Sequence, residues 1–209
     1  MLIVALTGGI ATGKSIVAKV LSQKGCFIQQ ADLLAQALMS PGGEVWNELV
    51  KHFGPRILKE DNSVDRKFLA NIIFHDPEER VFLNNLTHPL VLEKVKQTIL
   101  ELEKEGKYEI YVTEAALVIE SGYHKFYDRI ILTFCQPEIQ IQRLCQREGL
   151  SREKALEKIG SQMSDQEKIP FAHYLIDTSG TIENTIEQTE RVYFSLYQDL
   201  MLKKAGLLT

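Results

Sequence analysis

Residues 8–15 read Gly8-Gly9-Ile10-Ala11-Thr12-Gly13-Lys14-Ser15, which matches the G-x-x-x-x-G-K-S pattern of a phosphate-binding loop in full. The octet follows a short apolar run, Leu2–Leu6, and precedes a helical pattern of apolar residues that starts at Ile16. A strand, a glycine loop and a helix in this order form the context in which the motif binds phosphate. The sequence therefore predicts a nucleoside triphosphate site.

Each part of the octet has an expected role at that site. Successive backbone N–H groups of the loop form a nest for phosphate oxygens, and the helix that follows adds its positive dipole end. Lys14 is placed to reach the β- and γ-phosphates, and the Ser15 hydroxyl is placed to hold Mg²⁺. The expected nucleotide contacts are therefore Gly9, Ile10, Ala11, Thr12, Gly13, Lys14 and Ser15.

The composition is that of a globular chain of one domain, or of one domain with a helical insertion. The 209 residues are 44% hydrophobic and 25% charged, with a net charge of −4. That charge argues against a sequence-independent nucleic-acid binder. The three cysteines form no C-x-x-C pair, which argues against zinc and suits a reducing compartment. With neither a signal-peptide pattern nor a membrane span, we expect a cytoplasmic protein without membrane contact.

Five short apolar runs are expected to form strands, and helical patterns separate them. The runs are Leu2–Leu6, Cys26–Gln29, Ile110–Thr113, Arg129–Phe134 and Tyr174–Ile176. This alternation predicts an α/β fold with a mostly parallel five-stranded sheet that helices cover on both faces. From Ile182 to Leu196 the apolar residues follow the period of an amphipathic helix, which we expect to close the fold.

Two helical excursions interrupt this pattern. The gap from Asp32 to Glu109 is too long for one crossover, and its helical patterns are broken at residues 41–43, 54–55, 61–63 and 75–77. We interpret it as a helical insertion on the substrate side of the sheet. Pro89 inside it is expected in the first turn of a helix, with Thr87 or His88 as the cap. The second excursion, about 137–168, would be a lid in a phosphoryl-transfer enzyme.

Two carboxylates follow predicted strands. Asp32 comes just after the second strand, where a carboxylate could accept the proton of a substrate hydroxyl or orient that hydroxyl for attack on the γ-phosphate. The alternative is an N-cap for a helix that begins at Leu33. Glu114 ends the third strand and resembles the acid that supports Mg²⁺ in a Walker B arrangement, although a cap or loop role would also fit.

Arg143 and Arg147 lie four residues apart in a segment that Pro137-Glu138 opens as a helix. That spacing places both guanidinium groups on one helix face, where they could stabilise charge on the transferring phosphate. On the residues alone, a solvated face with weak ion pairs to Glu138 or Glu148 is the preferred interpretation.

Taken together, these residues resemble the dephospho-CoA kinase family from the start of the chain to about Gly180. The matching segments, in order, are Leu6-Thr7-Gly8-Gly9-Ile10-x-x-Gly13-Lys14-Ser15, Ala31-Asp32, Pro41-Gly42, Phe53-Gly54-Pro55, Asp61-x-Ser63-x-Asp65-Arg66, Ile73-Phe74-x-Asp76-Pro77-Glu78, His88-Pro89, Leu117 to Glu120, Arg143 with Arg147, and Ile176-Asp177-x-Ser179-Gly180.

The resemblance implies a P-loop kinase that phosphorylates the ribose 3′-hydroxyl of dephospho-CoA with ATP and Mg²⁺. It implies a core of about 1–31, 107–136 and 170–209, a CoA-binding insertion of about 32–106 and a lid of about 137–169. Asp32 would be the catalytic carboxylate beside Lys14. Arg143 would be a lid arginine on the ATP phosphates, with Arg147 as a helper, which reverses the preference stated above. We expect a monomer that binds no nucleic acid.

The sequence departs from the family pattern at four places. Gln30 replaces the first acid of the usual Asp-Ala-Asp, which puts a two-carboxylate site in doubt, and Gln36 replaces a frequent arginine. Ala116 replaces a proline, a milder change, and Thr178 replaces an asparagine on the adenine side. None of these changes removes the loop, Asp32 or the two arginines, so we expect an active enzyme.

Two other functions are compatible with the loop alone. A P-loop kinase of another small acceptor, such as a nucleoside or nucleotide, shares the mechanism, but the CoA-type pattern of the insertion argues against it. A GTP-dependent switch needs an N-K-x-D motif, and no Asn-Lys pair occurs in the sequence. The D-x-x-G match at Asp177–Gly180 lies far from the expected switch position and is attributed to chance.

Overall fold

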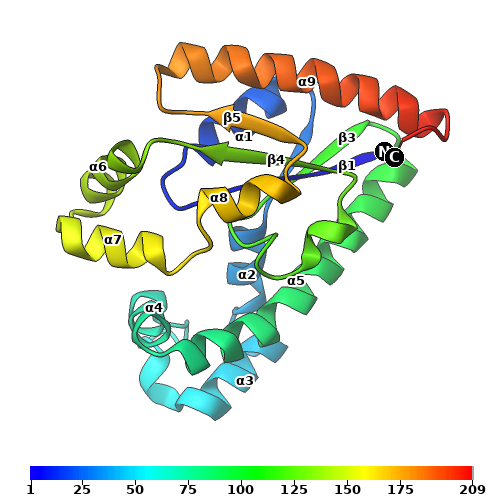
Figure 1. The fold of residues 1–209 in the computed structure, drawn as a ribbon. Coiled ribbons are helices and arrows are strands. Elements are labelled where there is room, and N and C mark those ends of the chain that lie inside the picture. The colour runs from blue at the N-terminus through cyan, green and yellow to red at the C-terminus, as the bar shows by residue number, and fades with distance from the viewer. Residues whose placement is uncertain (209) are drawn as a thin grey trace. The chain divides into compact units, whose positions relative to one another are not determined.

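The computed structural model describes residues 1–208, and it contains a five-stranded sheet with the order β2-β3-β1-β4-β5 (Figure 1). The strands are β1 (Leu2–Gly8), β2 (Phe27–Gln30), β3 (Ile110–Glu114), β4 (Arg129–Phe134) and β5 (Tyr174–Asp177). The five predicted strands are confirmed: β4 has the predicted ends, and the others differ from prediction by one or two residues at an end.

Helices occur between successive strands, except for a 3₁₀ turn between β3 and β4, and after the last strand, in the segments where the sequence shows helical patterns. They are α1 (Lys14–Gln23), α2 (Ala31–Leu38), α3 (Glu44–Phe53), α4 (Arg66–His75), α5 (Pro77–Glu105), α6 (Pro137–Glu148), α7 (Arg152–Gly160), α8 (Asp165–Lys168) and α9 (Ile182–Lys204). Short 3₁₀ turns occur at η1 (Pro55–Ile57), η2 (Tyr123–Phe126) and η3 (Ile169–Phe171). No helix of the described chain is both long and apolar enough to cross a membrane.

The central strand β1 delivers the phosphate loop to the middle of the sheet. It pairs in parallel with β3 on one side and β4 on the other, with Leu6 opposite Glu114 and Gly8 opposite Thr133. β4 in turn pairs in parallel with β5. Because the carboxyl ends of parallel strands share one edge, Glu114, Thr133 and Asp177 lie along the edge that carries the loop.

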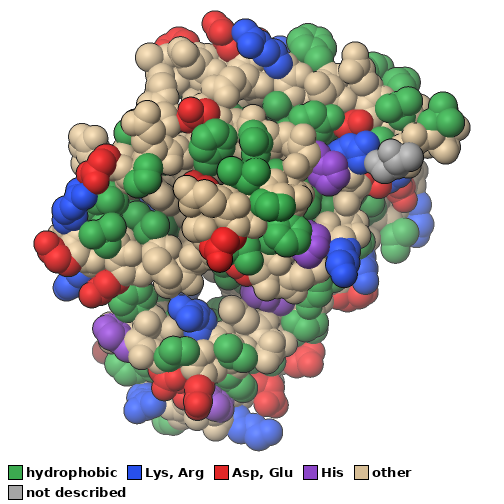
Figure 2. All heavy atoms as spheres, in the orientation of Figure 1, with side chains coloured by type: hydrophobic (Ala, Val, Ile, Leu, Met, Phe, Trp, Pro, Cys, Tyr) green, Lys and Arg blue, Asp and Glu red, His purple; other side chains and the backbone are tan. Residues whose placement is uncertain are grey.

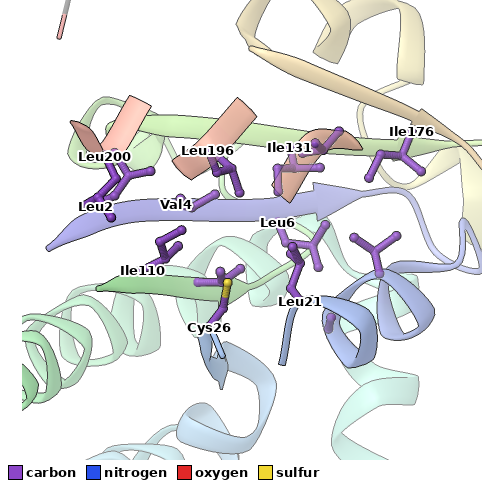
Figure 3. Packing of buried hydrophobic residues seen from close by; sticks show 14 residues of the cluster. Leu2, Val4, Leu6, Leu21, Cys26, Ile110, Ile131, Ile176, Leu196 and Leu200 are labelled. Carbon is purple, nitrogen blue, oxygen red and sulfur yellow. The ribbon is translucent and has the colours of Figure 1, made fainter. Parts of the chain in front are cut away.

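Both faces of β1 are buried, as expected for an inner strand of a parallel sheet. One face contributes Leu2, Val4 and Leu6 to a large core in which α1 and α9 take part (Figure 3). The members of that core are Leu2, Val4, Leu6, Val17, Ala18, Leu21, Cys26, Ile110, Val112, Ile131, Ile176, Val192, Leu196 and Leu200. On the opposite face, Ala5 packs in a smaller cluster with Val118 and Ile130.

The chain forms two compact units: Met1–Gln29 together with the chain from Glu101 onward, and Gln30–Leu100. The second unit has a hydrophobic core of its own, made by α3, α4, η1 and the first part of α5. Its buried members are Val45, Leu49, Phe53, Ile57, Val64, Leu69 and Leu83. On the face drawn in Figure 2, acidic and basic side chains are interspersed, in keeping with the small net charge.

The predicted helix start at Pro89 is wrong, because Pro89 lies inside the 29-residue helix α5. Proline removes one helical hydrogen bond and costs about 3 kcal/mol. The apolar side chains on both sides of it explain why the helix continues: Leu83, Leu86 and Leu90 pack in the core of the second unit. Thr87 is buried and donates its hydroxyl to the Leu83 carbonyl within the helix, so it caps nothing.

Candidate functional site

The loop between β1 and α1 has the backbone shape that its glycines predict. Gly8 has φ +149° and Gly13 has φ +84°, both in the region that favours glycine. Ala11 also lies there, with φ +62°. The α1 N-cap is Gly13, so no side chain at this position caps the first turn of α1, which begins directly at the loop.

The Lys14 side chain reaches back across the phosphate loop. Its ammonium donates to the carbonyl oxygens of Gly8 at 2.8 Å and Gly9 at 2.9 Å, which places the charge at the centre of the loop. Ser15, the next residue, is exposed in the first turn of α1. The two side chains predicted to serve phosphate and Mg²⁺ therefore begin the same helix, beside the backbone donors.

Buried threonine hydroxyls fasten the loop to the sheet. Thr12 donates to the Gly9 carbonyl at 2.8 Å, and its hydroxyl lies 2.9 Å from that of Thr133 at the end of β4. Both side chains are fully buried. Thr133 was not predicted as part of the site, although a polar residue at the second-last position of a buried and mostly apolar strand is a signal that could have found it.

Arg143 reaches the loop through Thr178, whereas Arg147 does not. The Arg143 guanidinium donates to the Thr178 hydroxyl at 3.0 Å and to the Thr178 carbonyl at 2.6 Å. The Thr178 hydroxyl in turn lies 3.0 Å from the Thr12 carbonyl, to which it can donate. Arg147 is 54% exposed and pairs with Glu148 at 2.7 Å, which is the surface ion pair that the residues alone suggested.

The α6 helix and the residues after α7 also contact the loop, at Ile10. The Gln140 side chain donates to the Ile10 carbonyl, and the Gln162 side-chain oxygen accepts from the Ile10 N–H, each at 2.8 Å. Neither glutamine was assigned from the sequence, because one polar residue in a helix (Gln140) or between two helices (Gln162) carries no local signal of such a contact. A cavity of about 460 Å³ lies beside them, with Gly9 and Asp165 also in its lining.

Helix α8 contributes a buried ion pair. The Lys168 side chain is completely buried, and its ammonium lies 2.8 Å from Glu120 and 3.4 Å from the Ala116 carbonyl. The same carbonyl accepts the Thr7 hydroxyl at 3.1 Å. Asp165 begins α8, and burial raises its pKa, while the positive charges of Lys168 and Lys14 oppose that rise.

Glu114 occupies the last position of β3, half-buried, and the next residue, Ala115, donates its N–H to the Leu6 carbonyl at 3.0 Å. Among residues 1–208, no group of three or more His, Cys, Asp or Glu side chains could hold a metal ion by itself. The two residues predicted to hold Mg²⁺, Ser15 and Glu114, fit this ion, because Mg²⁺ typically binds one or two protein oxygens together with substrate phosphates and water.

Asp32 lies in the second compact unit, as an exposed residue in the first turn of α2. Gln30 takes the N-cap position of that helix, so the alternative role of Asp32 as the N-cap is wrong. Gln36, which replaces the family's arginine, is half-buried one turn further along the same helix. The carboxylate of Asp32 is thus presented to solvent by α2 and does not serve as its cap.

Comparison with known proteins gives one consistent family. The model described as dephospho-CoA kinase matches residues 2–184. A dephospho-CoA kinase from Syntrophus aciditrophicus is 37% identical over 98% of this chain and 87% of its own length. One from Carboxydothermus hydrogenoformans is 39% identical over 89% of this chain and 90% of its own.

The fold agrees with the sequence match. The structure of a dephospho-CoA kinase from Campylobacter jejuni superposes with a TM-score of 0.67 at 26% identity, and the match covers 93% of this chain and 96% of that one. The predicted P-loop kinase fold is confirmed, and the chain belongs to the dephospho-CoA kinase family.

Proposed function

We propose that this member of the dephospho-CoA kinase family transfers the γ-phosphoryl group of ATP to the ribose 3′-hydroxyl of dephospho-CoA, with CoA and ADP as products. The observation that carries the proposal is the loop of residues 8–15. It has positive φ angles at Gly8, Ala11 and Gly13, and the Lys14 ammonium contacts the Gly8 and Gly9 carbonyls, within a chain whose family match covers residues 2–184.

We assign the ATP phosphates to the loop N–H groups, the start of α1, Lys14 and Arg143. A loose transition state spreads charge over the transferring group, and fixed cations lower its energy. Thr178 already holds Arg143 beside the loop, so this cation needs little reorganisation to act. Arg147 would serve only as an auxiliary cation, because it must first leave Glu148.

Mg²⁺ is assigned to the Ser15 hydroxyl and, directly or through water, to Glu114. When bound there, the ion would neutralise negative charge on the ATP phosphates. Ser15 is exposed at the start of α1, and Glu114 is half-exposed on the edge where the loop begins.

We assign the acceptor hydroxyl to Asp32, whose carboxylate would orient that hydroxyl and accept its proton. The unit Gln30–Leu100 would bind dephospho-CoA, and residues of about 137–169 would form the lid. We also propose that the protein acts as a cytoplasmic monomer. The thiols of Cys26 and Cys135 are free and buried, which suits a reducing compartment.

The test is ADP release with Mg-ATP, with dephospho-CoA compared against nucleosides, nucleotides and pantetheine compounds. We expect turnover with dephospho-CoA alone, ATP preferred over GTP, and loss of turnover with a Mg²⁺ chelator. Turnover with only a different acceptor would overturn the substrate assignment.

The Asp32→Asn variant tests the assigned proton acceptor. It should lower kcat by about 10²–10⁴ while the KM for ATP stays nearly constant. The control is Glu48→Gln, a partly exposed acid on α3 in the same unit, which should behave as wild type. Near-normal kcat in Asp32→Asn would remove that residue from the mechanism.

A further inference from the structure

Ile10 lies in the middle of the phosphate loop, and its N–H, its carbonyl and its side chain all contact residues outside the motif. Its N–H donates to Gln162, and its carbonyl accepts from Gln140. Its side chain packs, with that of Ala11, against a cluster on α6 and α7. The buried members of that cluster are Ile141, Leu144 and Ala155. Residues 137–162 are therefore anchored directly on the loop.

The orientation of both glutamine amides follows from their partners. A backbone N–H requires an acceptor and a carbonyl requires a donor, so Gln162 must present its oxygen and Gln140 its nitrogen. Gln140 is only 7% exposed, so its amide has little access to water as an alternative partner. A side chain at Gly9 would have its Cβ 2.9 Å from the Gln140 nitrogen, which shows how closely this amide fits against the loop.

These two bonds set two peptide planes, because each peptide unit is planar and trans. The N–H of Ile10 shares its plane with the Gly9 carbonyl, which points the opposite way and accepts from Lys14 at 2.9 Å. Likewise, the Ile10 carbonyl shares its plane with the Ala11 N–H, which must point away from Gln140. Ala11 has φ +62°, a strained value that the surroundings must maintain.

From this geometry we propose that Gln140 and Gln162 are positioning residues for phosphoryl transfer. Gln162 aims the Gly9 carbonyl at Lys14 and so fixes the ammonium, and Gln140 aims the Ala11 N–H into the phosphate nest. Both act through the backbone of Ile10 and touch no substrate. The proposal rests on the proposed use of ATP by this loop.

The experiment measures ATP affinity by titration calorimetry, together with kcat and KM, for Gln140→Met and Gln162→Met. Each variant keeps the length of the side chain and removes the hydrogen bond. We expect ATP affinity to fall about tenfold in each, because a buried backbone group loses its partner. The KM for dephospho-CoA should not change. Matched controls are Gln142→Met and Gln146→Met on α6, both exposed and outside the cavity beside the loop, which should bind ATP as wild type does.

Glutamate variants separate the hydrogen bonds from packing and from charge. Glu at position 162 keeps the acceptor for the Ile10 N–H, whereas Glu at position 140 sets a carboxylate against the Ile10 carbonyl. Gln162→Glu should therefore bind ATP more tightly than Gln162→Met, and Gln140→Glu more weakly than Gln140→Met. An added negative charge acting only on ATP would weaken both glutamate variants relative to their methionine partners.

Wild-type ATP affinity in both methionine variants, or the same glutamate-against-methionine order at both positions, would overturn the inference. Where a methionine variant does not fold, the glutamate variants compared directly with each other carry the decision: Gln162→Glu must bind ATP more tightly than Gln140→Glu. Failure of the wild-type protein to bind ATP would instead reject the proposed function, so the two failures are distinguishable.

Discussion

Replacing Lys168 by methionine should strongly destabilise the protein. The Lys168 side chain is completely buried, and its ammonium lies 2.8 Å from a Glu120 oxygen. Neither Glu120 oxygen has an aligned hydrogen-bond donor among residues 1–208, so the charge of Lys168 is the main compensation for that carboxylate. Removing one partner of a buried pair leaves an uncompensated charge, at a cost of about 3–5 kcal/mol.

That loss corresponds to a large shift in melting temperature. In a chain of this size each kcal/mol lowers Tm by about 2–4 °C, so the variant should melt roughly 6–20 °C below wild type. Circular dichroism during heating measures the shift, and urea titration measures the free energy of unfolding. The control is Lys158→Met, whose partly exposed pair with Glu148 should contribute less than about 1 kcal/mol.

A double-mutant cycle separates the ion pair from the packing of the lysine stem. Glu120→Gln alone should also destabilise, because it leaves the Lys168 ammonium buried without a counter-charge. Lys168→Met combined with Glu120→Gln leaves no buried charge. The double variant should therefore lose less stability than the two single losses added together, by about 2 kcal/mol or more. Simple addition of the two effects, or a cost of Lys168→Met below about 1 kcal/mol, would refute the reasoning.

Two smaller predictions concern the loop surroundings. Burial raises the pKa of Asp165 above its ordinary 3.8, so its ionised form costs stability at neutral pH. Asp165→Asn should therefore melt above wild type at pH 7, an advantage that shrinks as the pH falls towards 4 in scanning fluorimetry; a constant difference would contradict it. Thr178→Val should lose about 1–2 kcal/mol in urea titration, since it removes the hydroxyl between Arg143 and the Thr12 carbonyl, whereas Thr178→Ser should keep most of it.

The strands and the loop could be predicted because their signals are local. Leu2–Leu6 is apolar without interruption, as a strand buried on both faces requires, and the octet that follows has only one common structural use. Pro89 misled the prediction because proline is a strong helix-start signal, and the packing that carries α5 through it is tertiary. Tertiary packing overrides the helix-breaking preference of a proline where apolar residues on both sides of it pack in the same core.

The site residues that were not predicted from the sequence are those whose roles depend on contacts with residues far away along the chain. Gln162 lies between α7 and α8 and Lys168 ends the polar helix α8, and at both places a solvated side chain is the ordinary expectation. The structure buries the Lys168 side chain beside Glu120 and turns Gln162 towards the loop. Arg143 and Arg147 show the same limit: their spacing of four placed both on one helix face, but the structure joins Arg143 to Thr178, which contacts the loop at Thr12, and pairs Arg147 with Glu148.

The glycines of the octet themselves depend on the rest of the chain. A Cβ at any of the three would approach a side chain from the second half of the sequence; for Gly8, Gly9 and Gly13 these are, in order, Thr133, Gln140 and Thr178. Gly8 and Gly13 also need their positive φ, whereas Gly9 does not, and a Cβ at Gly9 would meet the end of the Gln140 side chain, which would have to shift. The motif is therefore a short stretch of sequence whose glycines are explained by tertiary structure, because distant residues packed against the loop limit the space for a side chain at these positions.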